Sequence, residues 1–168
     1  STTLFRLNCR AQRIGAAGWV YARMHFDLVD NVLFRSEDRI VTRKQVSLAE
    51  EYLQDHFPGF PVLPGVLMLE AMAQAARKLL NQPRLVVGGI KALRYGSMVR
   101  PGEALQIEVQ IAKDHGDGSY TCKGTGKVQR PGEPEPQETA VSGTFTLRPV
   151  LPPADTQTTP THGGREQP

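Results

Sequence analysis

The stretch His56-Phe-Pro-Gly-Phe-Pro-Val-Leu-Pro-Gly-Val-Leu-Met-Leu-Glu70-Ala-Met-Ala-Gln74 decides both the predicted fold and the predicted site. Prolines at positions 58, 61 and 64 disfavour helix, so the first half is predicted to be a stiff, extended loop. Pro64 and Gly65 then open a helix, because proline is tolerated in a first turn, where its missing N–H would have no partner. From Val66 to Ala76 the helix is apolar except at two positions, which predicts that it is buried all round.

Those two positions are Glu70 and Gln74, which lie four residues apart on one helix face. A buried carboxyl group is costly unless it is paired or neutral. Desolvation disfavours its charged form, so Glu70 is a candidate acid that holds a proton near neutral pH. His56 alone would be typical of a surface loop, but its place in the same proline-rich segment points to a catalytic pair. A structural alternative stays open, in which Glu70 and Gln74 satisfy backbone groups of a neighbouring strand.

Alternating apolar and polar residues outside this segment predict an antiparallel sheet. The clearest run is 105–111, where Leu, Ile and Val alternate with Gln and Glu. A short helix is predicted from the capping box Ser47-Leu-Ala-Glu50. Further strands are predicted in a hairpin within 28–41 and at 85–93, 119–129 and 138–147. One long apolar helix among consecutive strands indicates an α+β fold, with the sheet wrapped around that central helix.

The chain of 168 residues is long enough for a single core with short tails. Residues 1–23 are rich in arginine and contain no acid, and we interpret them as an N-terminal extension in preference to a transit peptide. The predicted domain spans 24–148. Residues 149–168 offer little to bury and are predicted to be disordered.

Composition narrows the class of partner. With 39% apolar and 22% charged residues the chain is typical of soluble globular proteins, and no apolar run is long enough to span a bilayer. The net charge of +3 favours an acidic protein partner, because no dense basic run with aromatic residues suggests nucleic acid. Cys9 and Cys122 form no disulfide framework, which predicts free thiols in a reducing compartment.

Other catalytic motifs are missing. Gly124-Thr-Gly-Lys127 lacks the preceding glycine and the following hydroxyl residue of a phosphate loop. No Cys/His cluster has zinc spacing, and no serine lies in a Gly-x-Ser-x-Gly elbow. We therefore predict neither a metal nor another cofactor.

The segment from His56 to Gln74 resembles the 3-hydroxyacyl-[acyl-carrier-protein] dehydratases of the FabZ type, which have a hot-dog fold. It carries their pattern His-Phe-Pro-Gly-x-Pro-x-x-Pro-Gly-Val-Leu-x-x-Glu-Ala-x-Ala-Gln without a gap. A weaker resemblance extends over 24–148 and includes Arg100-Pro-Gly-Glu103, where the family has a Val-Pro-Gly-Asp turn. The resemblance implies dehydration of a (3R)-3-hydroxyacyl thioester to the trans-2-enoyl thioester, in cytoplasmic synthesis of fatty acids or related lipids.

The expected mechanism is a syn elimination of water. His56 suits the base that takes the C2 proton, because imidazole titrates near neutral pH, and Glu70 suits the acid that protonates the leaving hydroxyl. The N–H of Gly65, at a helix N-terminus, can stabilise the enolate charge on the thioester oxygen. Gln74 is expected to orient Glu70. The predicted substrate-binding residues are Phe57, Pro64, Gly65, Val66 and Gln74.

The resemblance also implies partners. It implies a homodimer or a trimer of dimers, in which the histidine of one protomer works with the glutamate of the other and the acyl chain enters a tunnel between them. An acidic acyl carrier protein is expected to dock on cationic side chains, unless these are only a solvated surface. The predicted docking residues are Arg77, Lys78, Lys91, Arg94 and Arg100.

Three departures from the family pattern bear on activity. Asp55 replaces a glycine, and a carboxylate there would favour the protonated form of His56. Leu85 and Val86 lie where many relatives carry a tyrosine that gates the tunnel, and Arg77-Lys78 lies where small residues are common. Two other functions therefore stay open, a hot-dog acyl thioesterase and a non-catalytic domain that binds acyl thioesters.

Overall fold

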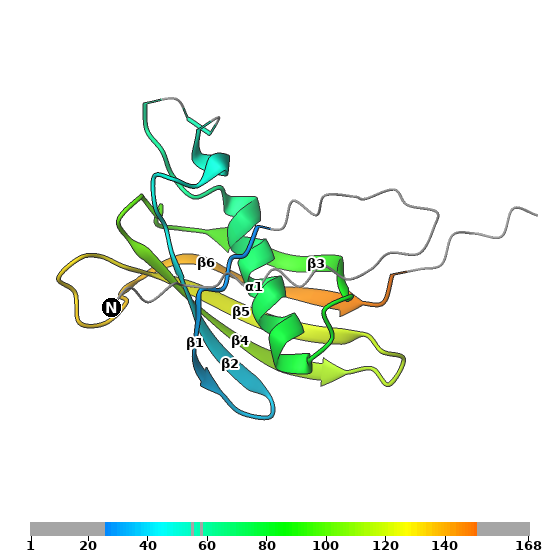
Figure 1. The fold of residues 1–168 in the computed structure, drawn as a ribbon. Coiled ribbons are helices and arrows are strands. Elements are labelled where there is room, and N and C mark those ends of the chain that lie inside the picture. Colours follow the sequence, from blue (N-terminus) through cyan, green and yellow to red (C-terminus); the bar gives the residue numbers. More distant parts are fainter. Residues whose placement is uncertain (1–25, 55, 58, 151–168) are drawn as a thin grey trace, which may run out of the picture.

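The computed structural model describes residues 26–54, 56–57 and 59–150 (Figure 1). The predicted N-terminal extension, Asp55 and nearly all of the predicted disordered tail lie outside the described residues. The elements are β1 (Asn31–Arg35), β2 (Arg39–Gln45), a 3₁₀ helix η1 (Glu51–Leu53), α1 (Gly65–Leu80), β3 (Val86–Tyr95), β4 (Ala104–Asp114), β5 (Tyr120–Gln129) and β6 (Glu138–Arg148).

The strands form one six-stranded sheet in the order β1-β2-β4-β5-β6-β3, with every neighbouring pair antiparallel. Helix α1 crosses one face of this sheet (Figure 1). The predicted α+β hot-dog architecture is therefore confirmed. Because β3 follows the helix but pairs only with β6, it forms one edge of the sheet, and β1 forms the other.

Helix α1 begins after Pro64 and ends at Asn81, which adopts a left-handed conformation with φ of 54°. Its core-facing side chains, such as Met72 and Ala75, are completely buried against the sheet. The prediction of burial all round is wrong for the first turn, where Val66 is 70% exposed. This turn lies beside the edge strand β3, and within residues 26–54, 56–57 and 59–150 no further layer covers it.

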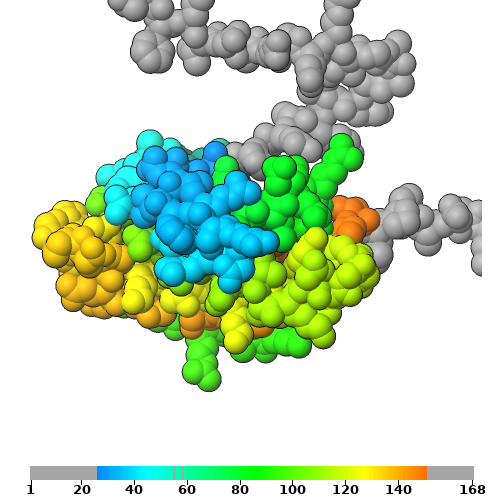
Figure 2. Space-filling view, turned by 90° about the horizontal axis from the view of Figure 1, so that it is seen from below, coloured from blue at the N-terminus to red at the C-terminus, as the bar shows by residue number. Residues whose placement is uncertain are grey.

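The predicted hairpin is present as β1 and β2, but its apolar residues are not all buried. Leu28 and Val29, just before β1, are in the core, whereas all five residues of β1 are exposed. The hairpin is fixed to the end of α1 by Arg35, whose Nη2 donates to the carbonyl of Leu79 at 2.9 Å. Seen from below, the hairpin (blue to cyan) and α1 (green) lie side by side (Figure 2).

The short helix predicted from the capping box is displaced. Its residues 47–50 precede the 3₁₀ turn η1, and no side chain caps that turn at Glu50. The helix at this position is only three residues long, because the chain enters the proline-rich loop directly after it.

Close packing of α1 on the sheet depends on Gly124 in β5. A methyl group at this position would overlap the side chain of Met72, whose Cγ would lie 3.1 Å from the new carbon. Met72 is fully buried and has no free space to move into. We expect Gly124→Ala to lower the free energy of unfolding by about 1–3 kcal/mol, because overpacking of a well-packed core costs about that much. Denaturant unfolding measures it, with Gly89→Ala as control, because a methyl group at Gly89 would meet nothing within 4 Å.

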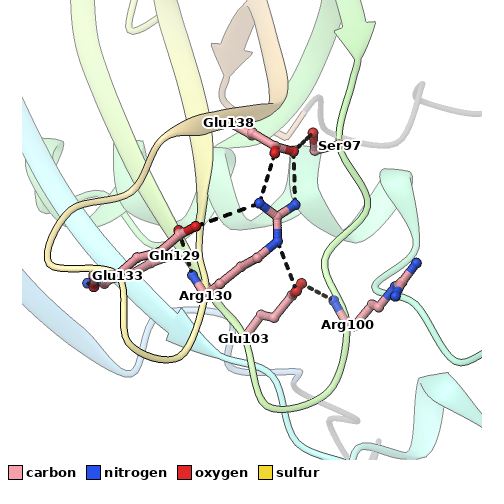
Figure 3. A network of polar contacts seen from close by, with 7 residues as sticks. All are labelled: Ser97, Arg100, Glu103, Gln129, Arg130, Glu133 and Glu138. Atoms are coloured by element: carbon pink, nitrogen blue, oxygen red, sulfur yellow. Dashed lines mark hydrogen bonds and ion pairs between the residues drawn. The ribbon is translucent and has the colours of Figure 1, made fainter.

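A network around Arg130 connects the end of β5 to the start of β6 and to the turn before β4 (Figure 3). Its guanidinium donates to both carboxylate oxygens of Glu138, at 2.8 and 2.9 Å, and lies 3.4 Å from Glu103. The other oxygen of Glu103 accepts from the backbone N–H of Arg100 at 2.8 Å. The hydrogen bonds from Arg130 and Ser97 lower the pKa of Glu138 from 4.5 to about 2.

This network predicts a specific pH dependence of stability. The pKa of Glu138 is depressed in the folded state, so its contribution is present above about pH 4.5 and is lost as the pH falls towards 2. We expect Arg130→Gln to lower Tm by a few degrees at neutral pH and to flatten the decline of Tm within this window. Thermal unfolding followed by circular dichroism at several pH values measures both effects. The exposed Lys123→Gln serves as control, and equal pH profiles for the two variants would contradict the prediction.

Candidate active site

His56 lies in the loop between η1 and α1, with its ring 4.5 Å from that of Phe57. Phe57 has a positive φ of 54°, which is uncommon for a residue other than glycine. The loop is held by a backbone hydrogen bond from Leu63 to Val99 and by Arg100, which lies 4.7 Å from the ring centroid of Phe60. The predicted stiff loop therefore rests against the turn that follows β3.

The start of this loop is braced by Lys44 of β2. Its ammonium group is buried and lies 2.9 Å from Glu50 and 3.2 Å from Asp30. Burial alone would lower the pKa of Lys44, but the hydrogen bonds to these two carboxylates outweigh it and raise the pKa. A charged, paired lysine thus holds the strand end from which η1 and the His56 loop emerge.

The N-terminus of α1 presents free N–H groups, as predicted. Among the described residues, no hydrogen-bond acceptor is found for the backbone N–H groups of Gly65 and Val66, whereas Leu67 donates to the carbonyl of Pro64 at 2.9 Å. An atom at the Cβ position of Gly65 would lie 2.8 Å from the ring of Tyr95. A side chain at this position would therefore displace the ring of Tyr95, a contact that the sequence did not reveal. Partial burial raises the pKa of the Tyr95 hydroxyl.

Glu70 lies on the second turn of α1 and contacts two side chains of the same helix. Gln74 donates to its Oε1 at 3.2 Å, and Arg77 Nη1 donates to the same oxygen at 2.6 Å. The side chain of Glu70 is 36% exposed, so the prediction that this carboxyl group is buried is wrong. The spacing of seven residues, nearly two helical turns, was the available signal for the pair with Arg77.

Gln74 has the role that the structural alternative assigned to it. Its amide donates to the carbonyl of Phe26 at 2.7 Å and its oxygen accepts from the N–H of Leu28 at 2.9 Å. It also donates to Glu70, so the predicted orienting contact is present as well. One amide group thus contacts both the backbone before β1 and the carboxyl group, whereas the hydrogen bonds of Glu70 among the described residues are to side chains only.

The described part of a single chain does not bring His56 and Glu70 into contact. A pocket of about 240 Å³ is lined by Gln74 and Arg77, and another of about 210 Å³ is lined by Phe57. Neither pocket is lined by His56 or Glu70. The described residues of one chain thus supply both predicted catalytic side chains but no enclosed cavity that joins them.

Three further observations concern metal binding, the cysteine thiol and membrane helices. Over residues 26–54, 56–57 and 59–150, no three His, Cys, Asp or Glu side chains cluster closely enough to hold a metal ion. Cys122 is a free, buried thiol, and burial raises its pKa to about 12. No helix in this part of the chain is long and apolar enough to cross a membrane.

Comparison with known proteins places the chain in a family. The family model described as "ApeI-like: ApeI dehydratase" matches residues 33–133. A protein from Clostridium perfringens named 3-hydroxyacyl-[acyl-carrier-protein] dehydratase FabZ is 40% identical over 120 residues, which cover 66% of this chain and 86% of the relative. A relative of the same name from Oenococcus oeni is 44% identical over 93 residues, 51% of this chain and 67% of the relative.

A solved structure agrees at the level of the fold. The dehydratase heterocomplex ApeI:P from Xenorhabdus doucetiae contains a chain that superposes with a TM-score of 0.52 at 19% identity, covering 70% of this chain and 96% of that chain. The matched family segment runs from β1 to the turn after β5 and so includes the His56 loop and the whole of α1. The chain therefore belongs to the ApeI-like family of dehydratases, as a relative of the FabZ 3-hydroxyacyl-[acyl-carrier-protein] dehydratases.

Proposed function

We propose that this protein removes water from a (3R)-3-hydroxyacyl thioester carried on acyl carrier protein and forms the trans-2-enoyl thioester. One observation carries the proposal. His56 and Glu70 occupy the positions of the family pattern, and the helix start that lies between them in the sequence has N–H groups without an acceptor among the described residues. The relatives named FabZ are dehydratases of this substrate class. The reaction belongs to cytoplasmic synthesis of fatty acids or related lipids.

In the proposed mechanism His56 takes the proton from C2 of the thioester. The enolate charge that develops on the thioester oxygen is stabilised by the N–H of Gly65, where the positive end of the α1 dipole adds to the hydrogen bond. Glu70 gives its proton to the C3 hydroxyl, which leaves as water because hydroxide itself is a poor leaving group. Pro64 and Val66 flank Gly65 at the helix start, and Phe57 lies in the preceding loop; all three are proposed to bind the acyl thioester.

The complete site is proposed to form between two protomers. Among the described residues, no strand pairs with the outer side of the edge strand β3, and this strand carries exposed apolar side chains at Ile90 and Tyr95. Val66 on the adjacent first turn of α1 is 70% exposed. Pairing of two β3 edges in a dimer would cover this surface and bring the His56 loop of one protomer towards Glu70 of the other. A trimer of such dimers would keep the same site.

The cationic side chains predicted to dock the carrier fall into two groups. Lys78, Lys91, Arg94 and Arg100 are exposed and are proposed to attract an acidic carrier protein. Arg77 is only 17% exposed and is already occupied by Glu70. The docking proposal therefore depends on the four exposed residues more than on Arg77.

The function is tested by incubating the protein with 3-hydroxybutyryl thioesters of acyl carrier protein and of pantetheine. We expect enoyl thioester, detected by absorbance and mass, with the higher kcat/KM on the carrier protein. Free 3-hydroxy acid would instead identify a thioesterase, in which a water molecule attacks the carbonyl group. Binding of both thioesters without any turnover would identify a non-catalytic acyl-binding domain and refute the proposed dehydration.

A further inference from the structure

Arg77 is the one charged side chain that contacts Glu70 in the described part of the chain, and its position departs from the small residues of the family pattern. Its Nη1 lies 2.6 Å from Glu70 Oε1. A positioning role for Arg77 rests on the proposed dehydration, because that reaction makes Glu70 the proton donor.

The guanidinium of Arg77 is fixed from two sides. Its Nε donates to the carbonyl of Leu85 at 2.7 Å, on the connection that leads into β3. Leu85 itself is 4% exposed and packs in the core, so this acceptor is rigid. The opposite side of the guanidinium faces Glu70. Because an arginine fork has a planar geometry, anchoring Nε also fixes the direction in which Nη1 and Nη2 point.

The two oxygens of Glu70 are therefore not equivalent. Oε1 accepts from both Arg77 Nη1 and Gln74 Nε2, while Oε2 has only Arg77 Nη2 at 3.5 Å. Gln74 is held in turn by the carbonyl of Phe26, so it cannot turn towards Oε2 without losing that bond. A proton on the Glu70 carboxyl group must then sit on Oε2, because Oε1 already accepts two hydrogen bonds.

The elimination moves charge onto this carboxyl group. The C2–H bond breaks and its proton goes to His56, the electron pair forms the C2–C3 double bond, and the C3–O bond breaks. The departing oxygen takes the proton from Oε2 and leaves as water. Glu70 becomes a carboxylate during this step, directly beside the guanidinium of Arg77. An interaction that strengthens as charge develops lowers the barrier, since it stabilises the transition state more than the bound substrate.

We propose that Arg77 is a positioning residue of the dehydratase, which directs Oε2 of Glu70 to the leaving hydroxyl and stabilises the carboxylate formed when the proton is given up. This role uses the same side chain that charge alone would assign to carrier docking. The contacts favour the positioning role, because the Arg77 side chain is only 17% exposed and its Nε and Nη1 donate hydrogen bonds within the chain.

Steady-state kinetics of Arg77→Gln and Arg77→Lys on carrier-bound 3-hydroxybutyryl thioester test the proposal. We expect Arg77→Gln to lower kcat about 10- to 100-fold, the usual cost of losing a residue that orients a reacting group, with KM changed less than about two-fold. Arg77→Lys should recover part of kcat, because it restores a charge near Glu70. The matched control is Arg84→Gln, an exposed arginine on the same connection, which should leave both constants unchanged.

A double-mutant cycle with Glu70→Gln separates action through Glu70 from any other effect. In the Glu70→Gln background, Arg77→Gln should change the residual rate less than about two-fold, because the group it serves is gone. An equal loss in both backgrounds, or a raised KM with unchanged kcat, would overturn the role of Arg77 and leave the dehydratase function intact. Absence of turnover by the unmodified protein would overturn both. Thermal unfolding of each variant identifies any loss of activity that comes from misfolding. If Arg77→Gln does not fold, the kinetics of a folded Arg77→Lys variant still test the role of Arg77.

Discussion

Glu70→Gln is expected to lower kcat for enoyl thioester formation by about 10²- to 10⁴-fold, the range that a general acid contributes. The amide has nearly the shape of the carboxyl group but cannot supply an acidic proton to the leaving hydroxyl. Its oxygen can still accept from Arg77 and Gln74, as Oε1 does now, with the amide nitrogen in the place of Oε2. The fold and the binding of the thioester should therefore persist, so the loss should appear in kcat and not in KM.

The measurement is the rate of enoyl thioester formation, with the product identified by mass. Glu135→Gln is the control, because Glu135 is exposed on the loop between β5 and β6 and makes the same change of charge. A Glu70→Gln variant that retains more than about one tenth of the rate would contradict the acid role. It would also undermine the inference about Arg77, which acts only through this carboxyl group.

Local patterns were sufficient to predict the elements that position the site. The proline and glycine at 64–65 predicted the start of α1, and the alternation at 105–111 predicted a strand that the structure places within β4. These signals are local, because helix initiation and sheet pleating are governed by residues close in sequence. The motif from His56 to Gln74 identified the family for the same reason, since its spacing is continuous along the chain.

The surroundings of Glu70 were not predictable in the same way. A hydropathy pattern shows which helix faces are apolar, but it does not show where the sheet ends beside them. Because β3 forms the edge of the sheet, the first turn of α1 is left uncovered and Val66 is exposed. The contact between Gly65 and Tyr95 joins residues thirty positions apart (95 − 65), and no local pattern marks it. Tertiary contacts of this kind decide burial, and burial decides the electrostatics of the site.

Mixing two inactive variants, His56→Ala and Glu70→Gln, is expected to restore about one quarter of the unmodified activity. In a two-fold dimer whose sites combine His56 of one protomer with Glu70 of the other, random exchange makes about half of the dimers mixed, and each mixed dimer holds one intact site and one doubly damaged site. The described part of one chain gives no contact between the two residues, while the exposed β3 edge offers a surface for such pairing. The experiment is co-expression with two different tags and measurement of enoyl formation by the unseparated mixture, and then by the isolated mixed dimers, which should have about one half of the unmodified activity. The control pairs Glu70→Gln with the double variant, whose mixed dimers contain no site with both residues and should stay inactive. A mixed dimer of the two single variants that is equally inactive would mean that each chain uses its own His56 and Glu70, and the edge strand β3 would then have to be covered in another way.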